Sequence, residues 1–158
     1  MPPLVSGDTR LLILGSFPGV ASLRARQYYG HPQNHFWKIL QAVWPLDVMG
    51  ADYQERSKWL LSKKLGVWDV YASCERVGSL DTSIRNAVLN DFSLLENLCP
   101  KLEAIAHNGG ESFKHSRHTM QTGLPVHKLP STSPANASWS FERKLAAWRE
   151  VFEKYGLS

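Results

Sequence analysis

Short apolar runs alternate with longer amphipathic segments along this 158-residue chain, and this alternation constrains the fold more than any other feature. The first run, Leu11–Leu14, is apolar at every position and is ended by Gly15, as in a central strand buried on both faces. Further strands are predicted at Val67–Tyr71, Leu102–His107 and Val126–Leu129. Strands that alternate with helices are typical of an α/β fold with a parallel sheet.

The segments between these runs carry helical signals. Helices are predicted from Asn34 to Pro45, over Ala51–Lys64, in pieces over Asp81–Cys99, and after the loop that ends at Ser138. The last helix places four apolar side chains on one face, at Phe141, Leu145, Trp148 and Phe152.

Composition narrows the class of protein. With 43% hydrophobic and 20% charged residues, a chain of this length is expected to form one globular domain over residues 1–158. No apolar run approaches the ~20 residues that cross a bilayer, and the start of the chain does not have the layout of a signal peptide. We therefore expect the protein in the bacterial or archaeal cytosol or nucleoid, and not in a membrane.

Two cysteines, Cys74 and Cys99, are too few for an iron–sulfur cluster or a zinc site made only of cysteines. The net charge of +4 is only a weak indication of a polyanionic partner.

Three loops follow predicted strands, and each is polar or rich in glycine and proline. They are Gly15–Gly19, Asn108–Gly110 and Ser131–Asn136, and Tyr28–His35 lies between the first strand and its helix. Ligands of open parallel sheets bind outside the carboxyl ends of the strands. We therefore expect these segments to converge on one crevice.

Taken alone, the first two segments have ordinary interpretations. Gly15–Gly19 is neither a dinucleotide fingerprint nor the nucleophile elbow of hydrolases, and it can be a tight turn. His31 and His35 are four residues apart, but Pro32 separates them and no glutamate stands where a zinc protease needs its base, so no metal is expected. Asn34 can serve as a helix N-cap.

The other segments also have two interpretations each. Asn108 begins a strand-to-helix turn, and its amide could equally read the edge of a base. Ser131–Asn136 offers hydroxyls and N–H groups for phosphates, or it is a solvated loop before the last helix. The tyrosines near Tyr29, together with Phe36, could enclose a planar ligand.

Five stretches together resemble the uracil-DNA glycosylase superfamily, and most closely its hypoxanthine-removing branch, the DNA-deoxyinosine glycosylases of family 6. They are LGSFPG at 14–19, QYYGHPQNHFW at 27–37, WDVYASCERVGSLD at 68–81, HNGG at 107–110, and LPSTSPANASWSFERKLAAW at 129–148. The resemblance covers nearly the whole chain, and the second and last stretches are its most specific parts. It implies a three-layer α/β/α sandwich around a four-stranded parallel sheet. It also implies hydrolysis of the N-glycosidic bond of a damaged base that is flipped out of DNA, with no metal or cofactor.

The chain departs from the uracil-removing families at three positions. Phe17 stands where those families carry the Asp or Asn that activates or positions water. The resemblance to the hypoxanthine branch implies that Asn34 takes over this role. Ser131 replaces a histidine and Ala135 replaces a leucine wedge. These departures favour hypoxanthine over uracil as the released base.

The resemblance assigns roles by position, with Asn34 as the catalytic residue that orients water toward C1′ of the sugar. The expected base pocket comprises Gly15, Ser16, Phe17, Tyr29, Phe36 and Asn108. The expected DNA-binding residues are Ser131, Ser133, Pro134, Ala135 and Asn136. The partner is expected to be double-stranded DNA with a damaged base, or single-stranded DNA, bound by a monomer. No lysine stands out as a Schiff-base nucleophile, which predicts a monofunctional glycosylase.

Three alternatives stay open at this point. The same fold could act on uracil, xanthine or an alkylated purine. The crevice could belong to a non-catalytic module that binds nucleic acid. A small-molecule hydrolase would instead use Ser16 as its nucleophile, although the sequence offers it no base or oxyanion partners.

Overall fold

A four-stranded parallel sheet forms the centre of the computed structural model, which describes all 158 residues. Its strands are β1 (Leu11–Gly15), β2 (Leu65–Asp69), β5 (Ala104–Asn108) and β6 (Val126–Leu129), in the spatial order β2-β1-β5-β6. The predicted α/β fold with a four-stranded parallel sheet is confirmed. Because β1 and β5 are the two central strands, the loops that follow them lie side by side.

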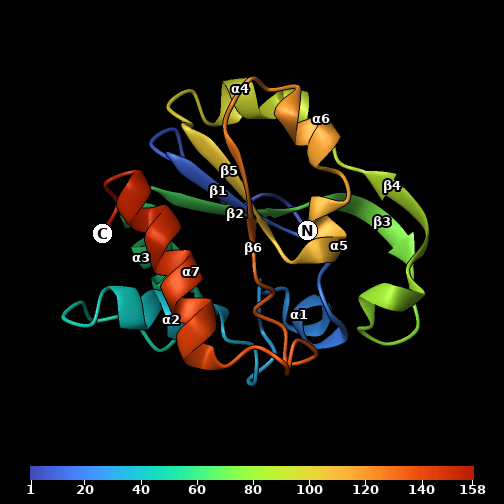
Figure 1. The fold of residues 1–158 in the computed structure, drawn as a ribbon, viewed down its shortest axis with the longest axis horizontal. Helices are drawn as coiled ribbons and strands as arrows, with labels where there is room; N and C mark the ends of the chain where they lie inside the picture. Colours follow the sequence, from blue (N-terminus) through green and yellow to red (C-terminus); the bar gives the residue numbers. More distant parts are fainter.

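Helices flank the sheet on both sides (Figure 1). They are α1 (Val20–Ala25), α2 (Phe36–Val43), α3 (Tyr53–Ser62), α4 (Leu95–Leu98), α5 (Gly110–Phe113), α6 (Ser116–Met120) and α7 (Phe141–Lys154). Helices α2, α3 and α7 cover one face, and α4 and α6 lie on the other side (Figure 1). None of these helices combines the length and the apolar composition required to cross a membrane.

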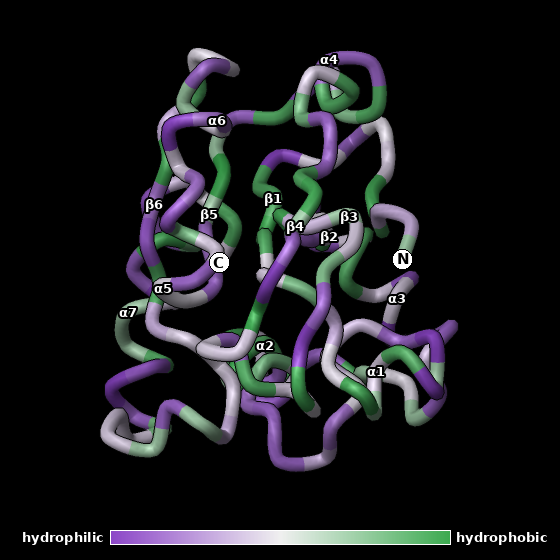
Figure 2. The backbone as a smooth tube through the Cα atoms, turned by 90° about the vertical axis from the view of Figure 1, so that its right-hand side faces the viewer, coloured by the Kyte–Doolittle hydropathy of each residue, from purple (hydrophilic) through white to green (hydrophobic).

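Strand β1 supplies both faces of the core, since successive side chains of a strand point to opposite sides. Leu11 and Ile13 pack into a cluster with residues of α2, α3 and α7. Leu12 and Leu14 pack into a second cluster that includes Phe92 and Leu95 of α4. Figure 2 shows the hydrophobic character of β1 and β5 and the largely hydrophilic edge strand β6. This two-sided burial explains why the run at β1 lacks alternation.

A small second sheet was not predicted. Strands β3 (Tyr71–Glu75) and β4 (Arg85–Leu89) pair antiparallel, so the prediction of helical pieces over Asp81–Cys99 is wrong for its middle part. Four of the five residues of β4 are exposed, and without a buried face the segment shows no period of two. Helical turns do form at η1 (Asp81–Ser83), η2 (Phe92–Leu94) and α4.

Two other boundaries differ from the predictions. The run predicted as one strand over Val67–Tyr71 is divided at Val70, because the N–H groups of Val70 and Tyr71 donate to the carbonyls of Gly15 and Ser16. This turn carries the chain from the main sheet into β3, beside the loop after β1. Helix α1 was also missed, since six residues are too few to show a helical period.

Candidate active site

A cavity of about 340 Å³ lies at the carboxyl ends of β1, β2 and β5. The cavity is lined by four segments of the chain and by two single residues, Asp69 and Asn108. The segments are residues 15–22 without 20, some residues of 28–34, some residues of 76–81, and residues 131–135. The predicted convergence of these segments is therefore observed for the loops after β1 and β6 and the segment before α2, whereas of Asn108–Gly110 only Asn108, the last residue of β5, borders the cavity. The contributions of Asp69 and of residues 76–81 were not foreseen.

Asn108, the last residue of β5, ties three of these segments together. Its Nδ2 donates to Tyr29 Oη at 3.2 Å and to Thr132 Oγ1 at 3.0 Å. Its Oδ1 accepts the N–H of Thr132 at 3.0 Å. All three bonds join residues distant in sequence, so the amide holds the loop after β6 and the tyrosine in fixed positions around the cavity.

Tyr29 stands in the cavity wall with its ring against Phe36, at a centroid distance of 4.1 Å. Its φ of 54° lies in the left-handed region, which costs energy for a residue with a Cβ. Burial, and then the nearby Asp69, raises the pKa of the phenol above its ordinary value, so the hydroxyl is protonated. Because that hydroxyl already accepts a bond from Asn108, its own hydrogen is free for a group in the cavity.

Phe36 was predicted to line the base pocket, and the structure places it elsewhere. The side chain is fully buried behind Tyr29 and belongs to the core cluster that α2 and α7 share. It does not border the cavity. As the first residue of α2, it faces the sheet together with the apolar stripe of that helix, and supports the tyrosine from behind.

Asn34 borders the cavity from the turn that precedes α2. Its Oδ1 accepts the N–H of Phe36 at 2.9 Å, so the side chain caps the start of the helix. A carbonyl oxygen has a second lone pair, which this bond leaves available. The next residue, His35, donates its N–H to Thr132 O at 2.9 Å, which fastens this turn to the loop after β6.

A buried lysine supports the same junction. Lys144 of α7 is 1% exposed, and its Nζ lies 3.2 Å from His35 Nδ1 and donates to Ser133 O at 3.4 Å. Burial lowers the pKa of this lysine below its ordinary value. His31, in contrast, accepts the N–H of Gln33 on its Nδ1, so the two histidines have separate partners. No group of three His, Cys, Asp or Glu side chains is arranged to hold a metal ion.

The loop after β1 is held by the loop after β3, which sequence reasoning did not include in the site. Ser16 Oγ donates to Asp81 Oδ1 at 2.9 Å. Arg76 donates to Pro18 O at 2.6 Å, and its guanidinium lies 5.6 Å from the centre of the Phe17 ring. The stretch at 68–81 is part of the family resemblance. Nothing in the spacing of its residues predicts that Arg76 and Asp81 contact the loop Gly15–Gly19.

Asp69 is the second residue that sequence reasoning missed. It ends β2, pairs in register with Gly15 and is 5% exposed. Burial raises the pKa of its carboxyl to about 7; Asp81 also raises it, while the amino terminus and Arg76 lower it. The sequence does contain one indication of this residue, because Asp69 follows an apolar strand and the ends of such strands are where open parallel sheets bind their ligands.

The loop after β6 forms one rim of the cavity through Ser131, Ser133, Pro134 and Ala135, as expected. Pro134 and Ala135 are exposed, whereas Thr132 between the two serines is buried. Asn136 does not border the cavity. It donates from Nδ2 to Ser131 O at 3.1 Å and so stabilises the shape of the loop.

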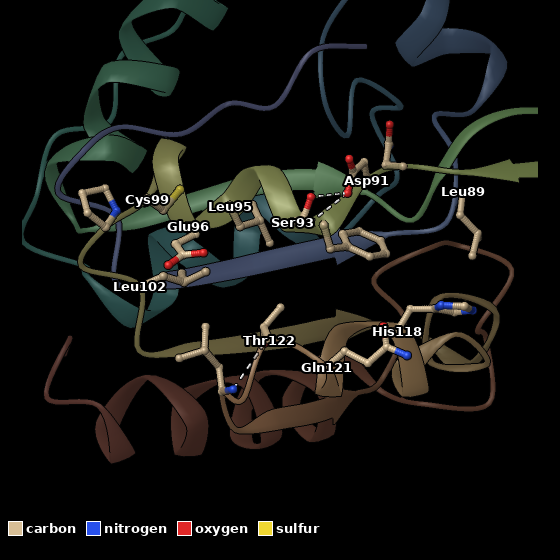
Figure 3. A pocket seen from close by; sticks show the side chains of 14 residues that line it. Leu89, Asp91, Ser93, Leu95, Glu96, Cys99, Leu102, His118, Gln121 and Thr122 are labelled. Atoms are coloured by element: carbon tan, nitrogen blue, oxygen red, sulfur yellow. Dashed lines mark hydrogen bonds between the residues drawn. The ribbon is translucent and has the colours of Figure 1, made fainter.

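A second hollow of about 650 Å³ lies between the η2–α4 segment and α6 (Figure 3). Asp91, Ser93 and Leu95 lie on one side of it, and His118 and Gln121 on the other (Figure 3). Most of its side-chain hydrogen bonds are local, such as Ser93 to Asp91 within the same turn, and the exception is Asn90, whose Nδ2 donates to Asp69 O at 2.8 Å. None of the predicted site residues lies there.

Comparisons with known proteins identify the family of this chain. The family described as the Uracil DNA glycosylase superfamily matches residues 2–152. A protein of Methanosarcina barkeri named hypoxanthine DNA glycosylase is 37% identical over 153 residues, which are 97% of this chain and 96% of that protein. A protein of the same name from Methanosarcina acetivorans is 35% identical over 151 residues, 96% of this chain and 95% of the relative.

A solved structure is also similar. It is a solution NMR structure of a Methanosarcina acetivorans protein named for uracil DNA glycosylase, with a TM-score of 0.87 and 34% sequence identity. The similarity covers 98% of this chain and 95% of that one. This chain, with its cavity at the carboxyl ends of a four-stranded parallel sheet, belongs to the uracil DNA glycosylase superfamily.

Proposed function

We propose that this protein is a DNA glycosylase that hydrolyses the bond between hypoxanthine and deoxyribose, leaving an abasic site. One observation carries the proposal: a chain that matches two hypoxanthine DNA glycosylases over nearly its full length has Asn34, Tyr29 and Asn108 around a single cavity. Phe17, at the position where the uracil-removing families carry a polar residue, has an apolar ring and cannot hold water.

Asn34 positions the water in this mechanism. An amide has no useful pKa and cannot act as a general base, but its carbonyl can accept a hydrogen bond from water. The bond from the N–H of Phe36 fixes the direction of that carbonyl. Capping the helix and orienting the water are therefore compatible tasks for one side chain.

The bond breaks between C1′ and the base nitrogen, and its electron pair stays with the base. Positive charge develops on the sugar, and the oxygen of water bonds to C1′. The pocket must then stabilise the departing base, and donors aimed at it are the usual means. Tyr29 offers its hydroxyl hydrogen, and Asn108 holds Tyr29 in place. Gly15 allows the base to approach because it has no side chain.

The rim of residues 131–135 is suited to the DNA backbone, since it carries serine hydroxyls and N–H groups. We propose double-stranded DNA as the substrate and a monomer as the active form. No lysine borders the cavity, which supports a monofunctional enzyme without strand cleavage. The cytosol or nucleoid remains the compartment predicted from the sequence.

The test is single-turnover base release from oligonucleotides that each carry one lesion: hypoxanthine, uracil, xanthine or an alkylated purine. We expect hypoxanthine to be released fastest, and Asn34→Ala to slow its release by about 10²-fold or more while DNA binding is retained. Equal rates for Asn34→Ala and the parent would reduce Asn34 to a helix cap. Salt-sensitive binding without release of any base would identify a non-catalytic module.

A further inference from the structure

The carboxyl of Asp69 has an unusual position for a charged group. It is 5% exposed, it borders the cavity, and its Oδ2 is buried without a hydrogen-bond partner. Buried polar atoms are almost always paired in proteins, and an unpaired one at a binding site calls for an explanation. Asp69 borders the cavity, so a substrate that binds there can supply a partner to the other oxygen of this carboxyl, Oδ1.

The surroundings of this carboxyl direct it into the cavity. A Cβ built on Gly15 would lie 2.7 Å from Asp69 Oδ1 and 3.1 Å from Tyr29 Oη. Gly15 therefore has the carboxyl and the phenol packed directly against its backbone, with no room for a side chain. A flipped base that lay against Gly15 would meet both groups.

The charge state of Asp69 decides whether it helps or opposes the reaction. Titratable groups face it from each neighbouring segment: Tyr28 and Tyr29 before α2, Arg76 after β3, Asp81 in η1, and the amino terminus. Burial raises its pKa to about 7, so near neutral pH a large share of the carboxyl is uncharged. An ionised carboxylate would repel the negative charge that develops on a departing base. A protonated one is a hydrogen-bond donor and an acid.

We propose that Asp69, in its protonated form, is the general acid that delivers a proton to a ring nitrogen of the departing purine. The inference rests on the proposed glycosylase function. The C1′–N bond breaks and its electron pair stays on the base, which takes the proton from Asp69 and leaves as neutral hypoxanthine. Water bonds to C1′ and loses a proton to the solvent, and the solvent returns a proton to the Asp69 carboxylate.

The test is the pH dependence of single-turnover release of hypoxanthine in the parent protein and in Asp69→Asn. We expect the parent rate to fall as pH rises above about 7, because the acid form of Asp69 is lost. Asparagine keeps the shape but cannot give up a proton, so Asp69→Asn should lose about 10²-fold or more at pH 6 and show no such fall. Glu96→Gln, which removes an exposed carboxylate at the second hollow, is the matched control and should behave as the parent.

A base that is already cationic separates proton delivery from a loss of shape. N7-methylated hypoxanthine leaves without an acid, so Asp69→Asn and the parent should release it at similar rates. An equal loss on the methylated and unmethylated bases, or a pH profile shared by the parent and Asp69→Asn, would overturn the role of Asp69. A parent protein that releases no hypoxanthine at any pH would overturn the proposed function itself.

Discussion

The two hollows of this protein differ in how they are built, and the larger one is not the candidate active site. The hollow between η2–α4 and α6 has about twice the volume of the cavity at the carboxyl ends of the strands. Most of its side-chain hydrogen bonds link residues two or three apart, as in Ser93 to Asp91, and the one long-range bond, from Asn90 Nδ2 to Asp69 O, leads to the end of β2. Around the smaller cavity, Asn108 binds Tyr29 across 79 positions and Ser16 binds Asp81 across 65. Bonds between distant segments fix a constellation of side chains, whereas local bonds only shape a turn.

The largest expected effect is on the free energy of unfolding, and it comes from the burial of Asp69 beside the smaller cavity. Its pKa of about 7 lies above the ordinary value of 3.8, so the folded protein binds the extra proton between about pH 4 and 7. Stability therefore falls as pH rises through this window. The loss amounts to about 4 kcal/mol for a shift of this size.

Asp69→Asn removes this loss, because its amide does not ionise. The difference in unfolding free energy between Asp69→Asn and the parent should grow in favour of the variant from pH 4 to 7 and then level off. Urea denaturation at a series of pH values measures it. His107 is fully buried with a pKa of about 4 and also titrates in this range, but it is the same in both proteins and cancels. A constant difference across pH would show that Asp69 is ionised in the folded protein.

Asn108→Ala tests the long-range bonds directly. The substitution leaves the buried N–H of Thr132 without its acceptor and Tyr29 Oη without its donor. We expect the unfolding free energy to fall by about 1–3 kcal/mol. Base release should slow as well, because the tyrosine is no longer held. An unchanged unfolding free energy would mean that the hydrogen bonds of Asn108 do not stabilise the fold.

Gly15→Ala tests the space between Asp69 and Tyr29. A methyl group there lies 2.7 Å from Asp69 Oδ1, closer than real contacts allow, so the carboxyl must move. We expect hypoxanthine release to slow by about 10-fold or more. Gly110→Ala is the matched control, since a Cβ there has nothing within 4 Å. Comparable rates for the two variants would remove the argument for a close approach at Gly15.

The smallest effect is expected at the larger hollow. His118→Ala removes a side chain from its wall and breaks none of the bonds around the smaller cavity. Base release and DNA binding should stay at the parent level in the lesion assay. A clear loss of release would show that the larger hollow takes part in the reaction and would reverse the comparison.

The sequence predicted the main sheet well, because its signal is local. The apolar run of β1 and the loops after β1, β5 and β6 could be located from residue types alone. Strand β4 could not, since its exposed residues have no buried face to produce a period of two.

The site was predicted only in part. Asn34, Tyr29 and Asn108 came from motif positions, but the unpaired carboxyl of Asp69 depends on burial, which a sequence does not display. Phe36 had the residue type expected for a base pocket, and only packing shows that Tyr29 stands in front of it. Arg76 and Asp81 reach the cavity through a hairpin whose pairing has no sequence signal.

Gly15, Asp69 and Asn108 end three adjacent strands of one hydrogen-bonded sheet. Neighbouring strands lie about 4.8 Å apart, so the backbone hydrogen bonds of the sheet set the intervals between these three residues. All residues of β1, β2 and β5 are buried, so these intervals depend on the core and not on the surrounding loops. Changes in the surrounding loops can therefore alter the binding of DNA while the spacing of the groups around the base is preserved.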